Sequence, residues 1–374
     1  MSGSSVPQAD PFASYLAQKG DIDAAVARVL QSGVYILGPE VEAFEAEFAA
    51  WLGVRFAVGT ASGTDALALG LRVLGIGPGD MVATVSHTAT ATVAAIELAG
   101  ASPVLVDVEQ GGFNMDPAAL ERLLADPPAP VRAVIPVHLY GRPARMAQIT
   151  EIARRHGLAV LEDAAQAHGA AVDGRKAGSF GQLGAFSFYP TKNLGALGDA
   201  GALVGDDPRL ESSARRLRQY GWERRFVAEA PGMNSRLGAL QAAVLRVKLP
   251  TLDEANARRR AIAAAYAVGL QGCDLILPEE GPGETAVWHQ YVVRTRERER
   301  IIGELAARGV RTGVHYRVPV HLQPAYAGRV AIGAGGLAVT ERLAGEILSL
   351  PIFPEMSDRA VQTVIAAVRA VCGG

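Results

Sequence analysis

One lysine in this chain is placed where covalent chemistry is possible. Lys192 follows an apolar run, Ala185 to Phe188, of the kind that forms a buried strand. Pro190 ends that strand, because proline cannot donate to the ladder of a sheet, and glycine-rich backbone follows the lysine. Such a lysine can leave the sheet and reach into a crevice, although an isolated lysine is more often simply solvated.

An acid follows a second apolar strand in the same way. The run from Leu158 to Glu162 leads directly into Asp163. In open α/β sheets ligands bind at the carboxyl ends of the strands, so we expect Asp163 and Lys192 to meet at one edge. An amine beside a carboxylate suits a Schiff base to pyridoxal phosphate, in which the acid keeps the pyridine nitrogen protonated. Capping of a following helix is the alternative for Asp163, and it is compatible with this role.

Other residues could hold the remaining parts of such a cofactor. The stretch from Thr60 to Ala66 joins a strand to a helix, and its small residues let backbone N–H groups meet a phosphate at the helix N-terminus. A plain Ser or Thr helix cap is the alternative for this stretch. The Ser187 hydroxyl, close to Lys192, could bind the same phosphate, and the Gln166 amide could reach the 3′ oxygen of the ring.

Three further features have both a structural and a functional interpretation. Asn234 precedes a predicted helix, so we interpret it first as a helix cap. His168 suits the core at least as well as it suits catalysis. The segment from Gly313 to Tyr326 is rich in hydrogen-bonding side chains separated by prolines. This composition suits a polyhydroxylated ligand and a structural loop equally well.

Strands and helices alternate from Arg55 onward, and these elements must position the reactive residues. The alternation predicts an α/β fold with a mainly parallel sheet between helices. After Pro208 the chain becomes mostly helical, which predicts a smaller α+β domain: we place an N-terminal arm and the large domain at residues 1–250 and the small domain at 251–374. Residues 1–20 look like a loose lead-in. The predicted strands are Arg55–Thr60, Met81–Ser86, Pro103–Val108, Ala133–Leu139, Leu158–Glu162, Ala185–Phe188, Ala202–Val204, Ala286–Val293 and Val310–Tyr316, and the predicted helices are Asp21–Leu30, Val41–Leu52, Thr64–Leu74, Thr90–Ala99, Pro117–Leu124, Met146–His156, Pro208–Tyr220, Leu237–Leu249, Leu252–Leu270, Arg298–Ala307, Val339–Ile347 and Asp358–Val371.

Bulk composition narrows the class of protein. The 374 residues are 49% hydrophobic and 20% charged, with a formal net charge of −2, which is typical of a globular enzyme and indicates neither a nucleic-acid nor a membrane partner. Cys273 and Cys372 lie far apart in the sequence and match no metal-ligand spacing, so we expect free thiols in a reducing cytoplasm. The first ten residues contain no apolar core of a signal peptide.

Five motifs, taken together and in order, resemble the DegT/DnrJ/EryC1 family of sugar aminotransferases that depend on pyridoxal phosphate. The resemblance runs from about Ser32 to Tyr326, which is most of the chain. It implies the fold-type-I aminotransferase architecture and a homodimer whose active sites are shared between subunits. The motifs are Gly33–Gly38, Ala61–Leu67, Glu162–Gly169, the stretch Phe186–Gly195 around the lysine, and Asn234–Arg236.

The resemblance also implies a role for each site residue. Lys192 would form the Schiff base and then move a proton between the donor α carbon and C4′ of the cofactor. Asp163 would pair with the pyridine nitrogen and Gln166 with the 3′ oxygen. The phosphate would be bound by Gly63, Thr64 and Ser187, and by Asn234 of the partner subunit; the sugar side would be lined by His315, Tyr316 and His321.

The segment around the lysine bears on the substrate. It resembles members that aminate a 3-keto-6-deoxyhexose on dTDP, whereas members acting at C4 usually have a histidine near position 189, where this chain has Tyr189. The implied reaction transfers an amino group from L-glutamate to a dTDP-3-keto-6-deoxyhexose. A 4-keto nucleotide sugar, a cyclitol ketone or a small amine are the alternative substrates.

Two departures from the family pattern affect the expected fit of the substrate. Ala89 stands where an aromatic ring often stacks on the cofactor, so either His87 or another ring takes that role or the ring face is open. Ala200 stands where glycine is usual. A dehydratase is a further alternative, but related dehydratases have histidine in place of Lys192. A non-catalytic binding or regulatory protein on the same fold is the last alternative, and the presence of Lys192, Asp163 and Gln166 argues against it.

Overall fold

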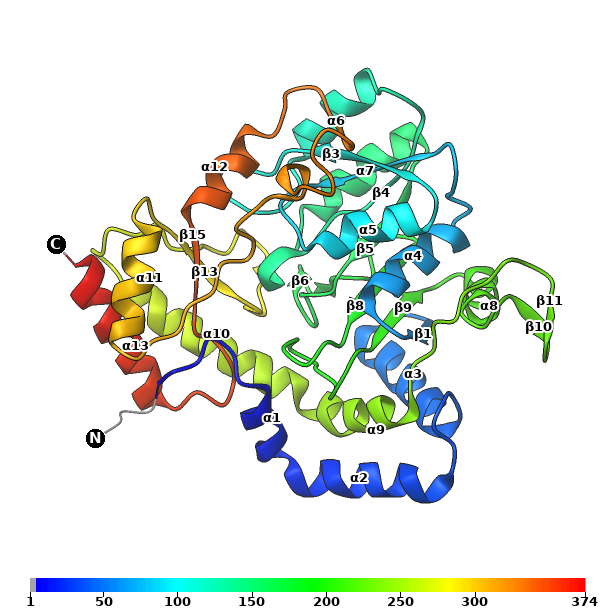
Figure 1. Cartoon of the computed structure of the whole chain (residues 1–374), viewed down its shortest axis with the longest axis horizontal. Helices are drawn as coiled ribbons and strands as arrows, with labels where there is room; N and C mark the ends of the chain where they lie inside the picture. The colour runs from blue at the N-terminus through cyan, green and yellow to red at the C-terminus, as the bar shows by residue number, and fades with distance from the viewer. Residues whose placement is uncertain (1–4, 374) are drawn as a thin grey trace.

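An eight-stranded sheet forms the centre of the molecule (Figure 1). The computed structural model describes residues 5–373. Every neighbouring pair in the sheet is parallel except those of β9, which runs antiparallel to both β1 and β8. The expected mainly parallel sheet is therefore confirmed. In spatial order the strands are β1 (Phe56–Thr60), β9 (Gly201–Gly205), β8 (Leu183–Ser187), β5 (Ala159–Asp163), β4 (Val131–Val134), β2 (Met81–Val85), β3 (Ser102–Val106) and β14 (Ala331–Ile332).

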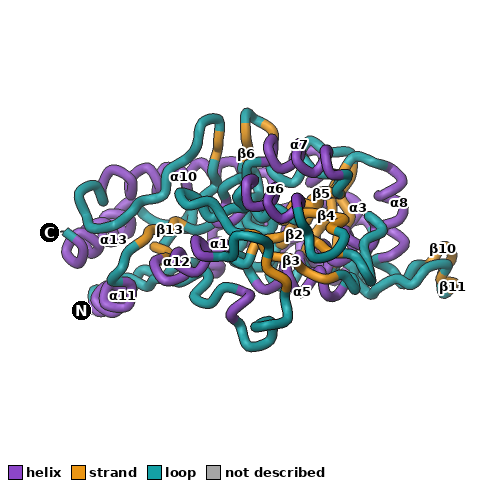
Figure 2. Tube along the Cα trace, turned by 90° about the horizontal axis from the view of Figure 1, so that it is seen from above, coloured by secondary structure: helices purple, strands orange, loops and turns teal. Residues whose placement is uncertain are grey.

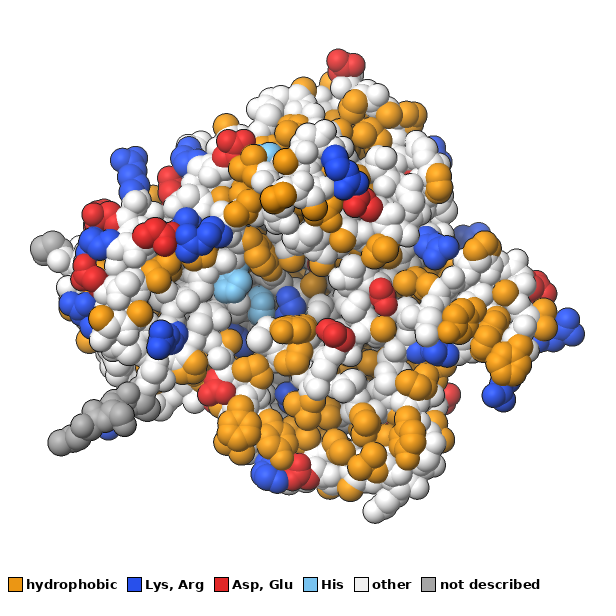
Figure 3. Space-filling model, in the orientation of Figure 1, with side chains coloured by type: hydrophobic (Ala, Val, Ile, Leu, Met, Phe, Trp, Pro, Cys, Tyr) orange, Lys and Arg blue, Asp and Glu red, His pale blue; other side chains and the backbone are white. Residues whose placement is uncertain are grey.

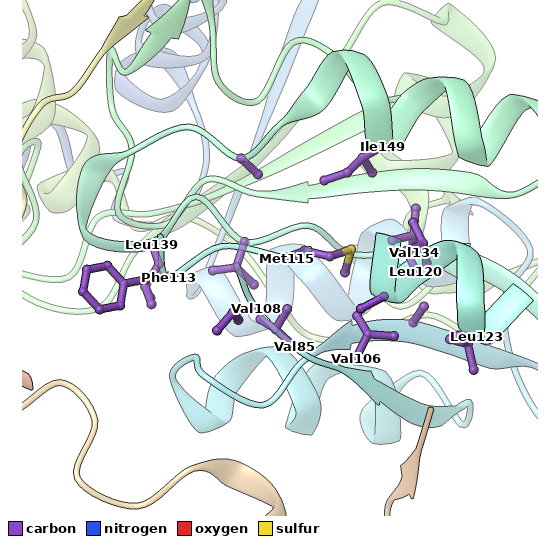
Figure 4. Packing of buried hydrophobic residues seen from close by; sticks show 14 of the residues in the cluster. Val85, Val106, Val108, Phe113, Met115, Leu120, Leu123, Val134, Leu139 and Ile149 are labelled. Carbon is purple, nitrogen blue, oxygen red and sulfur yellow. The ribbon is translucent and has the colours of Figure 1, made fainter. Parts of the chain in front are cut away.

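Helices cover both faces of this sheet, so its strands are apolar on both sides. In β2, Met81, Ala83 and Val85 pack with the α6 and α7 residues, whereas Val82 packs with α4 and α5 on the opposite face. This alternation follows from the two-residue period of a strand. Figure 4 shows part of the α6–α7 side of the core. The covering helices are α3 (Pro39–Leu52), α4 (Gly63–Val73), α5 (Thr90–Leu98), α6 (Pro117–Ala125), α7 (Met146–His156), α8 (Pro208–Leu217) and α9 (Ala239–Lys248).

The N-terminal segment is more ordered than the sequence indicates. Residues 1–4 lie outside the described residues, but α1 (Pro11–Ala17) occupies much of the expected loose lead-in, so that prediction is wrong. Asp10 caps α1 by accepting a hydrogen bond from the Ala13 N–H at 3.0 Å, and proline occupies the first helical position. The helix α2 (Lys19–Ser32) follows and packs against α9.

The C-terminal segment builds a separate hydrophobic cluster around a short antiparallel pair. Tyr266, Tyr291 and Leu305 are completely buried in it, and Val6 from the start of the chain joins them. The predicted division at residues 250 and 251 stays a prediction. The elements here are α10 (Leu252–Gly269), β13 (Tyr291–Arg294), α11 (Arg298–Ala307), α12 (Ala338–Glu346), β15 (Ile347–Leu350) and α13 (Asp358–Cys372), with β13 antiparallel to β15.

Several strand predictions are wrong in position. Residues 310–316 form no strand but make isolated bridges, from Val310 to Val6 and from Gly313 to Ser349. The predicted strand Ala286–Val293 begins only at Tyr291, because Trp288 adopts a left-handed backbone with φ of 45° and bends the chain. The small elements missed by the pattern are β6 (Ala171–Val172), β7 (Arg175–Lys176), β10 (Trp222–Arg224), β11 (Val227–Ala228), β12 (Glu284–Thr285), β14 (Ala331–Ile332), β15 (Ile347–Leu350), η1 (Leu139–Gly141), η2 (Leu249–Thr251) and η3 (Val320–Leu322).

The β10–β11 hairpin projects from the body of the molecule, at the end opposite α11 and α13 (Figures 1 and 2). At its tip the ring of Phe226 is 72% exposed, and the Arg225 guanidinium lies over it. None of the helices within residues 5–373 has the length and apolar character that a membrane span requires.

Candidate active site

The strands β5 and β8 end side by side and bring the two predicted reactive groups to one sheet edge. β5 ends at Asp163, which pairs with Ala185 of β8. The chain leaves β8, turns through Lys192 and is tied back by the Ala196 N–H, which donates to the Phe188 carbonyl at 2.8 Å. The face drawn in Figure 3 is hollowed near its centre, where histidine and basic side chains show. Asp163 and Lys192 thus follow the carboxyl ends of neighbouring strands, as expected from the sequence.

Burial and a nearby charge both act on the pKa of Lys192. Desolvation lowers the pKa of Lys192 to about 8, and the Asp163 carboxylate opposes this shift. Burial also raises the pKa of Asp163, against the effects of the Thr92 hydroxyl, the Ala165 N–H and the Lys192 charge. With a pKa near 8, lowered from the usual value of lysine, Lys192 is uncharged more often near neutral pH than an exposed lysine. A nucleophilic amine needs this uncharged form.

Asp163 is 5% exposed and both of its carboxylate oxygens are engaged. Oδ2 accepts a hydrogen bond from the Thr92 hydroxyl at 2.8 Å, and Oδ1 accepts one from the Ala165 N–H at 3.2 Å. Residues 164–170 form turns, so Asp163 does not cap a helix and that alternative is wrong. The two contacts fix the carboxylate while leaving further lone pairs for a cationic ligand.

Gln166 connects the acid-bearing turn to two tyrosines. Its Oε1 accepts a hydrogen bond from the Tyr140 N–H at 2.8 Å, and its Nε2 donates to the Tyr316 hydroxyl at 3.1 Å. One of the two N–H groups on Nε2 therefore remains for another acceptor. The Tyr140 hydroxyl bonds the His315 carbonyl and lies 2.8 Å from Nε2 of His87. His87 is thus fixed by Tyr140.

The turn before α4 forms a close cradle beside β8. A Cβ atom added at Gly63 would lie 2.6 Å from Cβ of Ser187, so only glycine fits there. Ser62 caps the helix by accepting from the Asp65 N–H at 3.1 Å, and Gly63 and Thr64 are the first two residues of the helix, whose backbone N–H groups have no acceptor within it. Gly63, Thr64 and Ser187, three of the four predicted phosphate residues, therefore lie together at a helix N-terminus, a position that favours anions.

The predicted substrate residues differ in their contacts. Burial lowers the pKa of His315, whose Nδ1 lies 2.8 Å from the Ser349 hydroxyl. His321 is buried, with its Nδ1 2.7 Å from the Ser86 hydroxyl and its Nε2 3.3 Å from Glu341. It therefore fastens the 313–326 segment to the end of β2.

For Asn234 and His168 the sequence left two interpretations, and the structure bears on each of them. Asn234 is exposed, and the cap position of α9 belongs to Gly238, so the helix-cap interpretation is wrong. Its neighbour Ser235 is buried and contacts the turn before α4, accepting from the Ala61 N–H at 3.0 Å. His168 packs between Phe186 and Phe188, and burial lowers its pKa to about 3, which fits the core interpretation.

The structure also shows where the two departures from the family pattern, Ala89 and Ala200, are located. Ala89 precedes α5 and is partly exposed. Ala200 is buried, and its carbonyl accepts from the Phe188 N–H at 2.8 Å, which joins β9 to the end of β8.

Three site residues were not found from the sequence. Thr92 bonds Asp163 from α5, Asn193 directly follows the lysine, and His289 lies 3.2 Å from Asn193 through its Nδ1. Asn193 could have been found from its place in the motif. Thr92 and His289 carry no local signal, because each reaches the site only through tertiary packing.

These residues fit pyridoxal phosphate. A buried acid stands near a lysine of lowered pKa, and a glycine cradle at a helix N-terminus lies beside Ser187. A model of the DegT/DnrJ/EryC1/StrS aminotransferase family matches residues 17–369. The chain belongs to this family. The resemblance seen in the sequence is confirmed, and with it the activity and the cofactor: the protein is an aminotransferase that depends on pyridoxal phosphate.

Individual family members are similar over nearly their whole length. The dTDP-3-amino-3,4,6-trideoxy-alpha-D-glucose transaminase of Streptomyces venezuelae is 49% identical over 365 residues, covering 97% of this chain and 95% of that protein. The crystal structure of S. venezuelae DesV in complex with a ketimine intermediate superposes with a TM-score of 0.94 at 49% identity, covering 98% of each chain. NtdA from Bacillus subtilis with bound cofactor PMP has a TM-score of 0.88 at 31% identity, over 99% of this chain and 86% of that one.

Proposed function

We propose that this aminotransferase transfers an amino group from L-glutamate to a 3-keto-6-deoxyhexose linked to dTDP. The observation that carries the proposal is the 49% identity, over nearly the full length, to a transaminase named for a 3-amino dTDP-sugar. The lysine segment, with Tyr189 and the glycines that follow it, supports the same sugar position. Bound pyridoxal phosphate supplies an electron sink that acidifies the donor α carbon.

Each residue has a task in this proposal. Lys192 holds the cofactor and then, as an uncharged amine, takes the proton from the donor α carbon and delivers it to C4′. A pKa near 8 favours both transfers at neutral pH. Asp163 holds the pyridine nitrogen protonated, and Gln166 donates to the 3′ oxygen through its free N–H.

The phosphate and the sugar are proposed to contact different sets of residues. Gly63 and Thr64 would bind the phosphate through the N-terminus of α4, and Ser187 through its hydroxyl. His315 and Tyr316 would face the sugar. His321 would act there by holding their loop against Ser86.

We further propose a homodimer in which Asn234 reaches the phosphate of the partner's site. Asn234 is exposed, and the hairpin next to it carries the exposed ring of Phe226. A second apolar surface covers the N-terminal helices (Figure 3). It includes Leu30, Tyr35 and Ile36, which are 54%, 49% and 53% exposed. Large apolar side chains exposed close to one another are typical of an interface.

We propose the cytoplasm as the location. Cys273 and Cys372 are free thiols, which suits a reducing compartment.

A substrate panel tests the reaction. The holoenzyme is incubated with L-glutamate and either the dTDP-3-keto or the dTDP-4-keto 6-deoxyhexose, and the amino sugar and 2-oxoglutarate are measured by mass spectrometry. We expect product from the 3-keto sugar, and none with Lys192→Ala, which should also lose the visible absorbance of the bound cofactor. Lys19→Ala, at an exposed position, is the matched control. Product from the 4-keto sugar alone would contradict the proposed substrate, and turnover by Lys192→Ala would contradict the proposed role of the lysine.

A further inference from the structure

One buried amide on α10 joins the two turns that carry the reactive residues. Asn256 is 2% exposed. Its Nδ2 donates a hydrogen bond at 2.8 Å to the His168 carbonyl, in the turn that follows Asp163. Its Oδ1 accepts one at 2.9 Å from Nδ2 of Asn193, the residue after Lys192. Since a carbonyl oxygen can only accept, the bond to His168 fixes which end of the Asn256 amide is the nitrogen, and each end therefore holds a different turn.

The ladder between β5 and β8 stops before it reaches the lysine. Its register ends at the pair of Asp163 and Ala185, and β8 itself ends at Ser187. Lys192 lies further along the chain, in the turn after β8. Side-chain hydrogen bonds to that turn therefore bear on where the amine stands relative to the acid.

The side chain next to the lysine is held at both ends of its amide. Besides its bond to Asn256, Nδ2 of Asn193 donates to the Val287 carbonyl at 2.9 Å. Its Oδ1 lies 3.2 Å from Nδ1 of His289. Both hydrogens on this amide nitrogen are thus used, and Asn193 cannot turn over without breaking its bonds to two other segments of the chain.

The acid side of the bridge is equally close. Gly169 has a left-handed backbone with a φ of 93°, and a Cβ atom there would lie 2.9 Å from Nδ2 of Asn256, so glycine admits the amide. The His168 ring packs between Phe186 and Phe188, which fixes the residue whose carbonyl takes the bond. The bridge therefore ends on a carbonyl that is itself held in place.

The helix that carries Asn256 is anchored to the C-terminal segment. Arg259, about one turn further along α10, is 5% exposed, and its guanidinium donates to the Ile352 carbonyl at 2.9 Å. Near the end of the helix the Tyr266 hydroxyl donates to the Pro351 carbonyl at 2.8 Å. Asn256 therefore projects from a helix that is fixed by other contacts.

We propose that Asn256 is a positioning residue for Lys192. Its amide ties the turn that carries the lysine to the turn that carries Asp163, and so sets how far the amine stands from the acid. It acts through Asn193 rather than on the reacting atoms. The inference rests on the proposed roles of Lys192 and Asp163.

Two substitutions at this position remove the bridge. Asn256→Ala deletes both hydrogen bonds and leaves space, whereas Asn256→Leu deletes them with a branched side chain that excludes a water from taking the place of the amide. Tyr266→Phe is the matched control, because it removes one buried hydrogen bond about 15 Å further along the same helix. All three variants should lose stability, and only loss of the bridge should affect Lys192.

Cofactor release from the holoenzyme gives the first measurement. The holoenzyme is diluted, and the pyridoxal phosphate that passes a small-pore filter is measured over time. We expect both Asn256 variants to release it about tenfold faster than wild type, since the loss of one or two buried hydrogen bonds is worth about this factor. Tyr266→Phe should release it at the wild-type rate, although its melting temperature falls as theirs do. Wild-type release by the Asn256 variants, or equal acceleration by Tyr266→Phe, would overturn the proposal.

A double variant tests whether the effect passes through Asn193. Asn193→Ala breaks the same bond from the lysine side and should itself speed release. In that background Asn256→Ala should add less than about a twofold change, because the amide on α10 no longer contacts the lysine turn. Effects that multiply in the double variant would show that the two residues act independently, and would overturn the proposal.

The protonation of Lys192 in the apoenzyme gives a readout that a purely structural bond would not change. The rate at which its amine is acetylated is followed against pH by mass spectrometry of the lysine peptide. Burial lowers the pKa of Lys192 to about 8, so a loosened turn that admits water should raise that pKa. The Asp163 carboxylate, which opposes the effect of burial, is retained in every variant. We expect the rise in both Asn256 variants and the wild-type value in Tyr266→Phe, and the same pKa in all four proteins would overturn the positioning role.

These readouts separate the proposal from the proposed reaction. Neither requires the keto sugar, so both remain informative if the substrate panel identifies another acceptor. Turnover by Lys192→Ala would remove the role of the lysine, whatever the Asn256 variants show. If neither Asn256 variant folds, the amide is a requirement of the fold, and the positioning role is overturned as well.

Discussion

At the scale of single residues, the site depends on how one buried carboxylate is held. Asp163 is expected to carry a charge opposite the pyridine nitrogen, yet burial raises its pKa. The Thr92 hydroxyl opposes that shift by donating to Oδ2. Thr92 therefore helps to keep the acid ionised in a place that would otherwise favour its neutral form.

Thr92→Val tests this dependence. The two side chains have the same shape, so the change removes a hydrogen bond to a charged group and little else. We expect the dissociation constant for pyridoxal phosphate to rise about tenfold, measured by absorbance titration of the apoenzyme. Thr92→Ser keeps the hydroxyl and should bind as wild type does. Equal affinity in all three proteins would contradict a role for Thr92.

The sequence revealed those residues that lie in contiguous motifs. Lys192, Asp163 and Gln166 follow strands whose apolar runs are visible, and parallel strands deliver their ends to one edge. His289 could not be found in this way. It falls inside a run interpreted as a strand, and the bend at Trp288 precedes its contact with Asn193, the residue after the lysine. A positive φ at tryptophan has no signature in composition.

At the scale of elements, the fit of α4 against β8 sets the geometry of the phosphate site. The closest approach is at Gly63, which faces backbone atoms of Ser187 as well as its Cβ. A shift of either element would separate the helix N-terminus from the hydroxyl. The alternation of strands and helices predicted both elements to within a few residues, because each has a continuous apolar pattern. The short pairs β6–β7 and β10–β11 were not predicted, because strands of two or three residues are too short to show an alternating apolar pattern.

A pair of glycine substitutions distinguishes this contact from helix propensity. Gly63→Ala should destabilise the fold by about 1–3 kcal/mol and weaken cofactor binding, because Cβ would overlap Ser187. Gly303→Ala lies in open space within α11 and should stabilise the fold by up to about 1 kcal/mol. Urea unfolding of both variants gives the free energies. Unchanged stability and cofactor affinity for Gly63→Ala would show that the cradle is not closely packed.

At the scale of the whole molecule, the proposed dimer shares each site between two chains. Lys192 and Asn234 would then act in trans, with the lysine from one subunit and the amide from the other. The hairpin beside Asn234 stands clear of the molecule, in a position suited to reaching a partner (Figure 2). Burial patterns alone could not reveal this arrangement, because an interface residue looks like an exposed one in the single chain.

Mixed dimers test the sharing. Lys192→Ala and Asn234→Ala are coexpressed with different tags, and dimers carrying both tags are purified. One of the two sites then combines an intact lysine with an intact asparagine, so about half of wild-type activity should return although each parent is impaired. Mixed dimers no more active than their parents would place Asn234 in the site of its own chain.

The strand-like bridge at Val6 has a consequence for biosynthesis. The Val6 N–H donates to the Gly309 carbonyl at 2.8 Å, and the Arg311 N–H donates back to the Val6 carbonyl at 2.9 Å. A ribosome adds about 5–20 residues each second, so this early segment waits about 15–60 s for the roughly 300 residues that separate it from its partner. The beginning of the polypeptide is therefore among the last parts to dock, and chaperones meet it long before its neighbours exist.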